Sequence, residues 1–288
     1  MIKENIKEVK NYVSKSNLPT YDYVINPYVG CPHACKYCYA SFMKRFTNHN
    51  QEDWGSFIDV KVCNKKINVK KLENKTVSMS SVTDCYNPLE AKYKITRGIL
   101  EQFKGSNVIL GIVTKSKLIL RDIDILKQIK NLTVAISINT LDEDFKNDMD
   151  RASSIKDRLN TLKTLHENGI YVVLFMSPIF PYITDFKSII ETSKDYVNEY
   201  WFENLNLRGD YKYRILNYIE EKYPHFIDKY KEIYIKKDMN YWELLSKDID
   251  IYCKAAGVKY VNFFYHEQLV KNKLENKNIR IKNDTGVH

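Results

Sequence analysis

The sequence predicts an α/β protein, a partial (β/α)6 barrel built from parallel strands. Two observations predict this fold. Short β-rich segments alternate with helical ones, and several β-rich segments are continuous apolar runs, such as VILGIV at 108–113 and YVVLF at 171–175. Strands of that kind are covered on both faces, as in a parallel sheet whose crossover helices pack on it. In such barrels the reactive groups lie at the carboxyl ends of the strands.

Seven strands are expected in order along the chain, and turn or helix signals separate them. They are placed at residues 21–26, 76–80, 108–113, 132–138, 170–176, 200–207 and 259–264.

Two helices have recognisable ends. The first is expected between Asn87 as its cap and Gly105 at its end, with Pro88 at the first helical position and Glu90 at the third. The second is expected over 154–168, where an apolar face recurs at helical spacing and Gly169 stops it. The segment 64–75 is the least regular insertion.

The chain shows neither an internal repeat nor a linker rich in Pro, Gly or Ser. We therefore expect an N-terminal extension at 1–20, one barrel domain at 21–267 and a polar C-terminal tail at 268–288.

Composition restricts the function classes. The 288 residues include 44% hydrophobic residues, enough for a large core. No apolar run approaches the roughly 20 residues that span a bilayer, and the charged N-terminus lacks a signal-peptide pattern. A cytoplasmic protein without a membrane partner is expected. The net charge of +9 fits either an evenly charged surface or an anionic partner such as nucleic acid, and it leaves both open.

Three of the six cysteines, Cys31, Cys35 and Cys38, fall within eight residues in the spacing CxxxCxxC, just beyond the first predicted strand. Three thiolates can hold three corners of a 4Fe–4S cluster and leave the fourth iron open for a cofactor. The alternative is a non-catalytic zinc-binding module. Structural zinc takes four N or S ligands, His33 sits in a cramped place between two cysteines, and no second CxxC follows.

At these residues the sequence resembles the radical S-adenosylmethionine superfamily, and within it the branch that includes spore photoproduct lyase. The likeness covers roughly residues 20 to 265, and the cysteine motif is its most specific part. The residues that carry it are 26–28, 30–31, 33, 35, 37–40, 80–84, 114–116 with 120–122, 137–140, 151–152 with 158–159, 176–178 and 204–206.

The resemblance implies that the cluster binds S-adenosylmethionine and splits it reductively to a 5′-deoxyadenosyl radical, which abstracts hydrogen from a substrate. It also implies an electron donor of the flavodoxin or ferredoxin type and, in this branch, a paired radical protein. Repair or modification of a nucleic acid is the first expectation for the substrate. Modification of a peptide or protein is the alternative.

The same resemblance, together with places at the strand ends, gives the cofactor-binding candidates. The backbone of Tyr37 is expected at the adenine, polar groups after the second strand at the amino group, and cations at the carboxylate. For the polar residues after the second strand, the alternative is a turn where a helix begins. For Lys115, Ser137 and Asn139 the alternative is an exposed loop residue, and for Arg151 it is an ion pair with Asp148 or Asp150. The candidates are Tyr37, Ser81, Thr83, Asp84, Lys115, Ser137, Asn139, Arg151 and Ser177.

Cys85 follows the second strand on the face where the radical would form. The resemblance implies a catalytic thiol in this region that returns a hydrogen atom to the product radical. The alternative is a small apolar residue packed where a helix begins, as is usual for a free cysteine.

Overall fold

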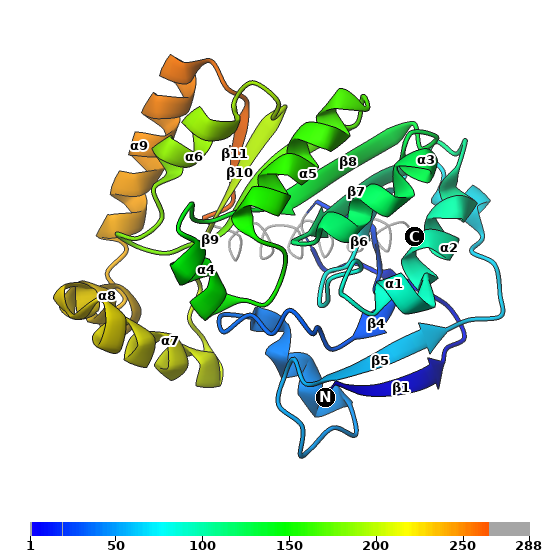
Figure 1. The fold of residues 1–288 in the computed structure, drawn as a ribbon, viewed down its shortest axis with the longest axis horizontal. Helices are drawn as coiled ribbons and strands as arrows, with labels where there is room; N and C mark the ends of the chain where they lie inside the picture. Colours follow the sequence, from blue (N-terminus) through cyan, green and yellow to red (C-terminus); the bar gives the residue numbers. More distant parts are fainter. Residues whose placement is uncertain (1, 19, 265–288) are drawn as a thin grey trace, which may run out of the picture.

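The computed structural model describes residues 2–18 and 20–264, which form a large sheet, a small sheet and surrounding helices (Figure 1). The predicted C-terminal tail at 268–288 and the last residues of the predicted barrel domain, 265–267, lie outside the described residues.

The large sheet has eight strands in the order β11-β10-β9-β8-β7-β6-β3-β2. Every neighbouring pair from β3 to β11 is parallel, and β2 runs antiparallel to β3. Among the described residues β2 and β11 form its two edges, so the sheet is an open, partial barrel. The predicted fold class and all seven predicted strands are confirmed. They are β3 Tyr23–Ile25, β6 Thr76–Met79, β7 Ile109–Thr114, β8 Asn131–Ser137, β9 Tyr171–Ile179, β10 Glu199–Asn204 and β11 Tyr260–Asn262. The eighth strand, β2 Val13–Lys15, was not predicted.

Helices cover the outer face of this sheet. Figure 1 shows α5 (Ile155–Glu167), α6 (Phe186–Ser193) and α9 (Asn240–Ala256) along it, and α5 packs against β8 and β9. The other helical segments lie in the connections: η1 Tyr39–Phe46, η2 Val69–Leu72, α1 Glu90–Tyr93, α2 Ile95–Leu100, η3 Glu101–Phe103, η4 Lys117–Asp122, α3 Ile123–Leu126, α4 Glu143–Met149, α7 Gly209–Lys222, η5 Pro224–Phe226 and α8 Ile227–Tyr234.

The helix predicted over 154–168 is confirmed as α5. The Ser154 hydroxyl accepts the Asp157 N–H at 3.0 Å as its cap, and Gly169 takes φ +75° just beyond its end.

The single helix predicted from Asn87 to Gly105 is wrong. The structure has three short pieces there, α1, α2 and η3, and the chain breaks at Lys94 with φ +53°. The cause is the buried Glu90, whose carboxylate accepts the N–H groups of Thr96 and Arg97. These are the first free donors of α2, so Glu90 caps a separate helix.

The small sheet, order β1-β5-β4, joins β1 (Lys3–Glu8), β5 (Phe57–Val62) and β4 (Tyr28–Val29); β4 and most of β5 are buried, whereas β1 is exposed. It was not predicted. Its inner side buries Ile58 and Val60 against Tyr28, and it lies apart from the outer helices in Figure 1. Because β4 leads directly into the cysteine motif, this sheet supports the site.

None of the helices in the part of the chain that the structure describes has the length and apolarity of a bilayer-spanning segment.

Candidate active site

The cysteine motif forms a tight loop between β4 and η1. Gly30 opens it with φ +87°, and a side chain there would overlap the carbonyl oxygen of Phe57 in β5. Gly55 packs equally closely on Ala34 in the middle of the loop, so a Cβ at Gly55 would collide with that of Ala34. Glycine is therefore required at Gly30, where the loop contacts β5, and at Gly55, where the segment before β5 contacts the loop.

Three hydrogen bonds tie the loop to the barrel. The Lys36 N–H donates to the Met149 carbonyl at 2.9 Å, and the Arg151 N–H donates to the His33 carbonyl at 2.8 Å. The Thr83 hydroxyl donates to the Gly30 carbonyl at 2.7 Å. The loop is therefore held at the carboxyl ends of the strands, where a parallel barrel gathers its chemistry.

The three thiols of the loop are shielded from water. Cys31 is buried, and Cys35 and Cys38 are half-buried. Burial raises the pKa of the Cys31 thiol well above its usual range, with Asp84 and the other two thiols adding to the effect. Burial likewise raises the pKa of Cys35 to about 12, although Lys115 opposes this rise. Such thiols stay protonated until a metal displaces their protons.

This donor set fits a 4Fe–4S cluster. Among the described residues no three His, Cys, Asp or Glu side chains converge on a single metal ion. Each thiol of a cluster binds its own iron atom, so three thiols on one loop serve three corners. The His33 Nδ1, buried in the same loop, has no hydrogen-bond partner within the described part of the chain.

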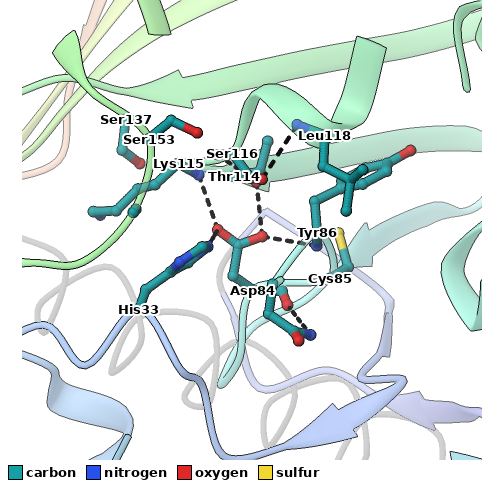
Figure 2. A network of polar contacts seen from close by, with 12 residues as sticks. His33, Asp84, Cys85, Tyr86, Thr114, Lys115, Ser116, Leu118, Ser137 and Ser153 are labelled. Atoms are coloured by element: carbon teal, nitrogen blue, oxygen red, sulfur yellow. Dashed lines mark hydrogen bonds and ion pairs between the residues drawn. The ribbon is translucent and has the colours of Figure 1, made fainter. Parts of the chain in front are cut away.

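Asp84, at the turn after β6, is the centre of a buried polar network (Figure 2). One carboxylate oxygen accepts the Thr114 hydroxyl at 2.7 Å and the Tyr86 N–H at 2.9 Å. The other accepts the Lys115 N–H at 2.9 Å and lies 3.2 Å from His33 Nε2. Burial by itself would raise the pKa of Asp84, but His33 and the hydrogen bonds from the Lys115 N–H and the Thr114 hydroxyl together lower it to about 2. Asp84 therefore joins the cysteine loop to β6 and β7.

Lys115 and Tyr37 lie side by side. The Lys115 ammonium is 5.6 Å from the centre of the Tyr37 ring. Burial raises the pKa of Cys35 and Cys38, and the charge of Lys115 offsets part of this rise. The Tyr37 hydroxyl donates to Asp150 at 3.4 Å. The ammonium of Lys115 consequently faces the cysteine loop, whereas only its backbone is engaged by Asp84.

Ser81 and Thr83 shape the turn after β6. The Asn26 side-chain oxygen accepts the Ser81 N–H at 2.9 Å, and the Asn26 amide donates to the Ser81 hydroxyl at 3.1 Å. The Ser81 carbonyl also accepts the hydroxyl of Tyr39. The two candidates and Asn26 thus connect β3, β6 and the cysteine loop.

The ends of β8, β9 and β10 bring further polar groups to the same edge. Ser137 and Asn139 are both buried, and the Asn139 amide donates to the Pro178 carbonyl at 2.9 Å. The Ser177 hydroxyl donates to Glu203 of β10. Glu203 was missed from the sequence. Its signal was a carboxylate two residues from Trp201 on the same side of a strand, opposite the buried Tyr200 and Phe202.

A second missed pair is Arg158 with Asp150. Both side chains are almost fully buried, with Arg158 Nη2 and the Asp150 carboxylate 2.6 Å apart, and Arg158 also donates to the Ser137 carbonyl at 3.1 Å. The signal was an arginine on the otherwise apolar face of α5, since a buried charge needs a partner. The neighbouring candidate Arg151 is exposed, and Asp150 is paired with Arg158 instead.

Cys85 lies in the core with no exposed surface. Its carbonyl accepts the Thr96 hydroxyl at 2.7 Å, and burial raises the pKa of its thiol well above its usual range. In Figure 2 its sulfur points away from His33 and Lys115.

Residues 25–194 match the family described as the radical SAM superfamily. An uncharacterized protein of Methanocaldococcus jannaschii is 39% identical over 75% of this chain and 82% of its own length. A mutant of spore photoproduct lyase with bound AdoMet and dinucleoside spore photoproduct shares the fold at 17% identity and a TM-score of 0.55, over 77% of this chain and 66% of that one. Streptococcus suis SuiB bound to S-adenosylmethionine does so at 16% identity and a TM-score of 0.55, over 83% of this chain and 49% of that one.

Proposed function

The chain belongs to the radical SAM superfamily and is a radical SAM enzyme, and from that premise we propose that Cys31, Cys35 and Cys38 hold a 4Fe–4S cluster. When bound, the cluster supplies the electron that splits S-adenosylmethionine into methionine and a 5′-deoxyadenosyl radical. The observation that carries the proposal is the shielded loop of three thiols, fixed to the carboxyl ends of parallel strands. Burial of Cys31 and partial burial of Cys35 and Cys38 limit the access of water, which protects a reactive radical.

We propose that some of the candidate residues bind S-adenosylmethionine and that the others position the cysteine loop. Lys115 and Ser137 bind S-adenosylmethionine directly, because the Lys115 ammonium faces the cysteine loop and Ser137 lies at the end of the next strand. Ser177 and Asn139 line the same edge at the end of β9 and just beyond β8. Arg151, exposed beside the loop, reaches the cofactor carboxylate.

The remaining candidates position the loop. Both carboxylate oxygens of Asp84 accept hydrogen bonds from protein groups, and one of them also contacts His33. The Thr83 hydroxyl donates to the Gly30 carbonyl. Ser81 is engaged with Asn26. Tyr37 supplies its backbone to the adenine, since its ring is buried and its hydroxyl is turned to Asp150.

For the substrate we propose a nucleic acid that the enzyme repairs or modifies. The net charge of +9 supports this, and the structurally similar spore photoproduct lyase was solved with a dinucleoside photoproduct. A peptide or protein substrate is the second candidate, because the sequence resembles a branch of paired radical proteins. An acidic one-electron donor of the flavodoxin or ferredoxin type supplies the electron. Six unpaired cysteines support a location in the reducing cytoplasm.

The test is anaerobic reconstitution with iron and sulfide, followed by dithionite and S-adenosylmethionine. We expect a brown protein that forms 5′-deoxyadenosine and methionine, with more product when the true substrate is present. Separate pools of DNA, RNA and cell protein identify the substrate class. A colourless zinc protein that leaves S-adenosylmethionine intact would establish the zinc-binding alternative.

A further inference from the structure

Two aromatic rings and two cations crowd the surface of η1, which begins directly after the last motif cysteine. Phe42 is 42% exposed and Phe46 63% exposed, and Lys44 and Arg45 lie in the last turn. The first turn contains no acidic residue. We call Phe42, Lys44, Arg45 and Phe46 the η1 patch.

The η1 patch is organised rather than loose. The Arg45 guanidinium lies 4.8 Å from the Phe46 ring centre and 5.3 Å from that of Phe42, and the two rings meet edge to face at 6.5 Å. Within the described part of the chain neither Lys44 nor Arg45 forms a salt bridge. A cluster of exposed apolar rings with unneutralised cations marks an interaction surface.

The η1 patch is covalently and structurally next to the proposed cluster. Tyr39 follows Cys38, and the Ser41 N–H donates to the Cys38 carbonyl at 3.3 Å. A partner seated on η1 therefore stands one helical turn from a cluster ligand. The surface is small, and complexes that exchange electrons are at the low end of interface size.

We propose that the η1 patch is the docking surface for an acidic one-electron carrier of the flavodoxin or ferredoxin class. The inference rests on the proposed function. One electron leaves the carrier, which is oxidised by one equivalent, and the cluster is reduced by one equivalent, without any bond being made or broken. Acidic side chains of the carrier meet Lys44 and Arg45, and its apolar rim packs on Phe42 and Phe46.

Charge and shape favour a protein over a nucleic acid at this place. An apolar centre with flanking charges matches the anatomy of protein interfaces, in which aromatic residues and arginine are enriched. A nucleic acid is held chiefly through a row of phosphate contacts, whereas η1 offers two cations.

The experiment compares two reductants on the full-length, cluster-loaded protein. Reduced flavodoxin and dithionite are each mixed with wild type, Arg45→Glu and the double variant Phe42→Ser with Phe46→Ser, and bleaching of the cluster is followed by stopped flow. We expect Arg45→Glu to slow reduction by flavodoxin about tenfold at low salt and to flatten its salt dependence, because charge steers the encounter. We expect the double variant to raise the Kd for flavodoxin about tenfold. Reduction by dithionite stays at the wild-type rate.

The matched control changes an exposed apolar residue and a lysine elsewhere, Ile251→Ser with Lys247→Glu on α9, which lies away from η1 in Figure 1. It should behave as wild type. Flavodoxin binding and reduction at wild-type levels in both η1 variants would overturn the proposal. Loss of oligonucleotide binding with unchanged reduction would overturn it in favour of a nucleic-acid surface. Calorimetry with flavodoxin reports on docking even in protein that fails to cleave S-adenosylmethionine, so failure of the proposed function is seen separately.

Discussion

His33 Nε2 lies 3.2 Å from a carboxylate oxygen of Asp84, and both side chains are buried. This contact connects the middle of the cysteine loop with the end of β6, and through Asp84 with Thr114 at the end of β7 and with Lys115, which follows it. The geometry of the thiols is thus coupled to the two strands beside them.

Asp84 should make the apo-protein sensitive to acid. The pKa of Asp84 is lowered to about 2 in the folded protein, from the usual 3.8 of a solvent-exposed aspartate. The contribution of Asp84 to stability is therefore present above pH 3.8 and is lost as the pH falls towards 2. The shift corresponds to about 2 kcal/mol at neutral pH. Urea unfolding of wild type and Asp84→Asn between pH 2 and 7 measures it. The variant should lose stability at neutral pH and show a weaker acid dependence, and parallel curves would contradict the assignment.

Each of the three motif cysteines should be needed for iron. Cys31→Ala, Cys35→Ala and Cys38→Ala leave one cluster corner without a protein ligand. Iron and sulfide after anaerobic reconstitution should fall far below wild type in all three. Cys63→Ala, a half-buried thiol outside the motif, is the control and should load normally. Full loading of any motif variant would remove that residue from the ligand set.

Lys115→Met should weaken binding of S-adenosylmethionine to the loaded protein. A hydrogen bond to a charged group contributes about 1.5–3 kcal/mol, so the Kd should rise by roughly tenfold or more. Stability of the apo-protein should hardly change, because Asp84 contacts the Lys115 backbone. Lys117→Met, an exposed lysine paired with Asp157, is the matched control for calorimetry. Equal affinity of both variants would exclude Lys115 from the cofactor site.

Substitution of Arg158 should lower stability, whereas substitution of Arg151 should weaken cofactor binding. Arg158→Ala leaves the Asp150 carboxylate buried with only Lys146, at 3.7 Å, as a cation, and should cost about 3–5 kcal/mol of stability. Arg151→Ala removes an exposed side chain and should change stability by less than about 0.5 kcal/mol while weakening cofactor binding. Thermal unfolding and calorimetry on the two proteins give both values. The reverse order of stability would show that the pair is misassigned.

Cys85→Ala tests whether this thiol donates hydrogen, as the resemblance implies, or only packs in the core. Because the thiol is buried in the core, we expect a loss of about 1 kcal/mol in stability with unchanged products and unchanged deoxyadenosine formation. Chromatography of the reaction with the identified substrate decides the question. A variant that still cleaves the cofactor but misprocesses the substrate radical would establish the donor role.

The parallel strands could be predicted because the pattern that marks a strand lies within the strand's own residues. In several of them this pattern is a continuous apolar run that ends at a turn. The strand β1 could not be predicted, since KENIKE is fully exposed and pairs with β5 about fifty residues away. The break at Lys94 depends on how the carboxylate of Glu90 is used, which no local pattern reveals.

The candidate site divides in the same way. The three cysteines of the loop lie within eight residues, so their spacing alone predicts a common site. Asp84 was expected at the cofactor, but its two oxygens are engaged by groups up to 51 positions away, including His33. Glu203 was missed because its partner, Ser177, lies on another strand. Partners of buried charges are set by topology, which a single sequence does not display.

Lys36, Arg151 and Thr83 hold the cysteine loop through hydrogen bonds whose acceptors are main-chain carbonyl oxygens. None of these three bonds needs a thiol. On the proposed function, variants that lose one motif thiol should therefore unfold like wild type even where iron loading falls, so that a folding defect and a ligand defect can be told apart.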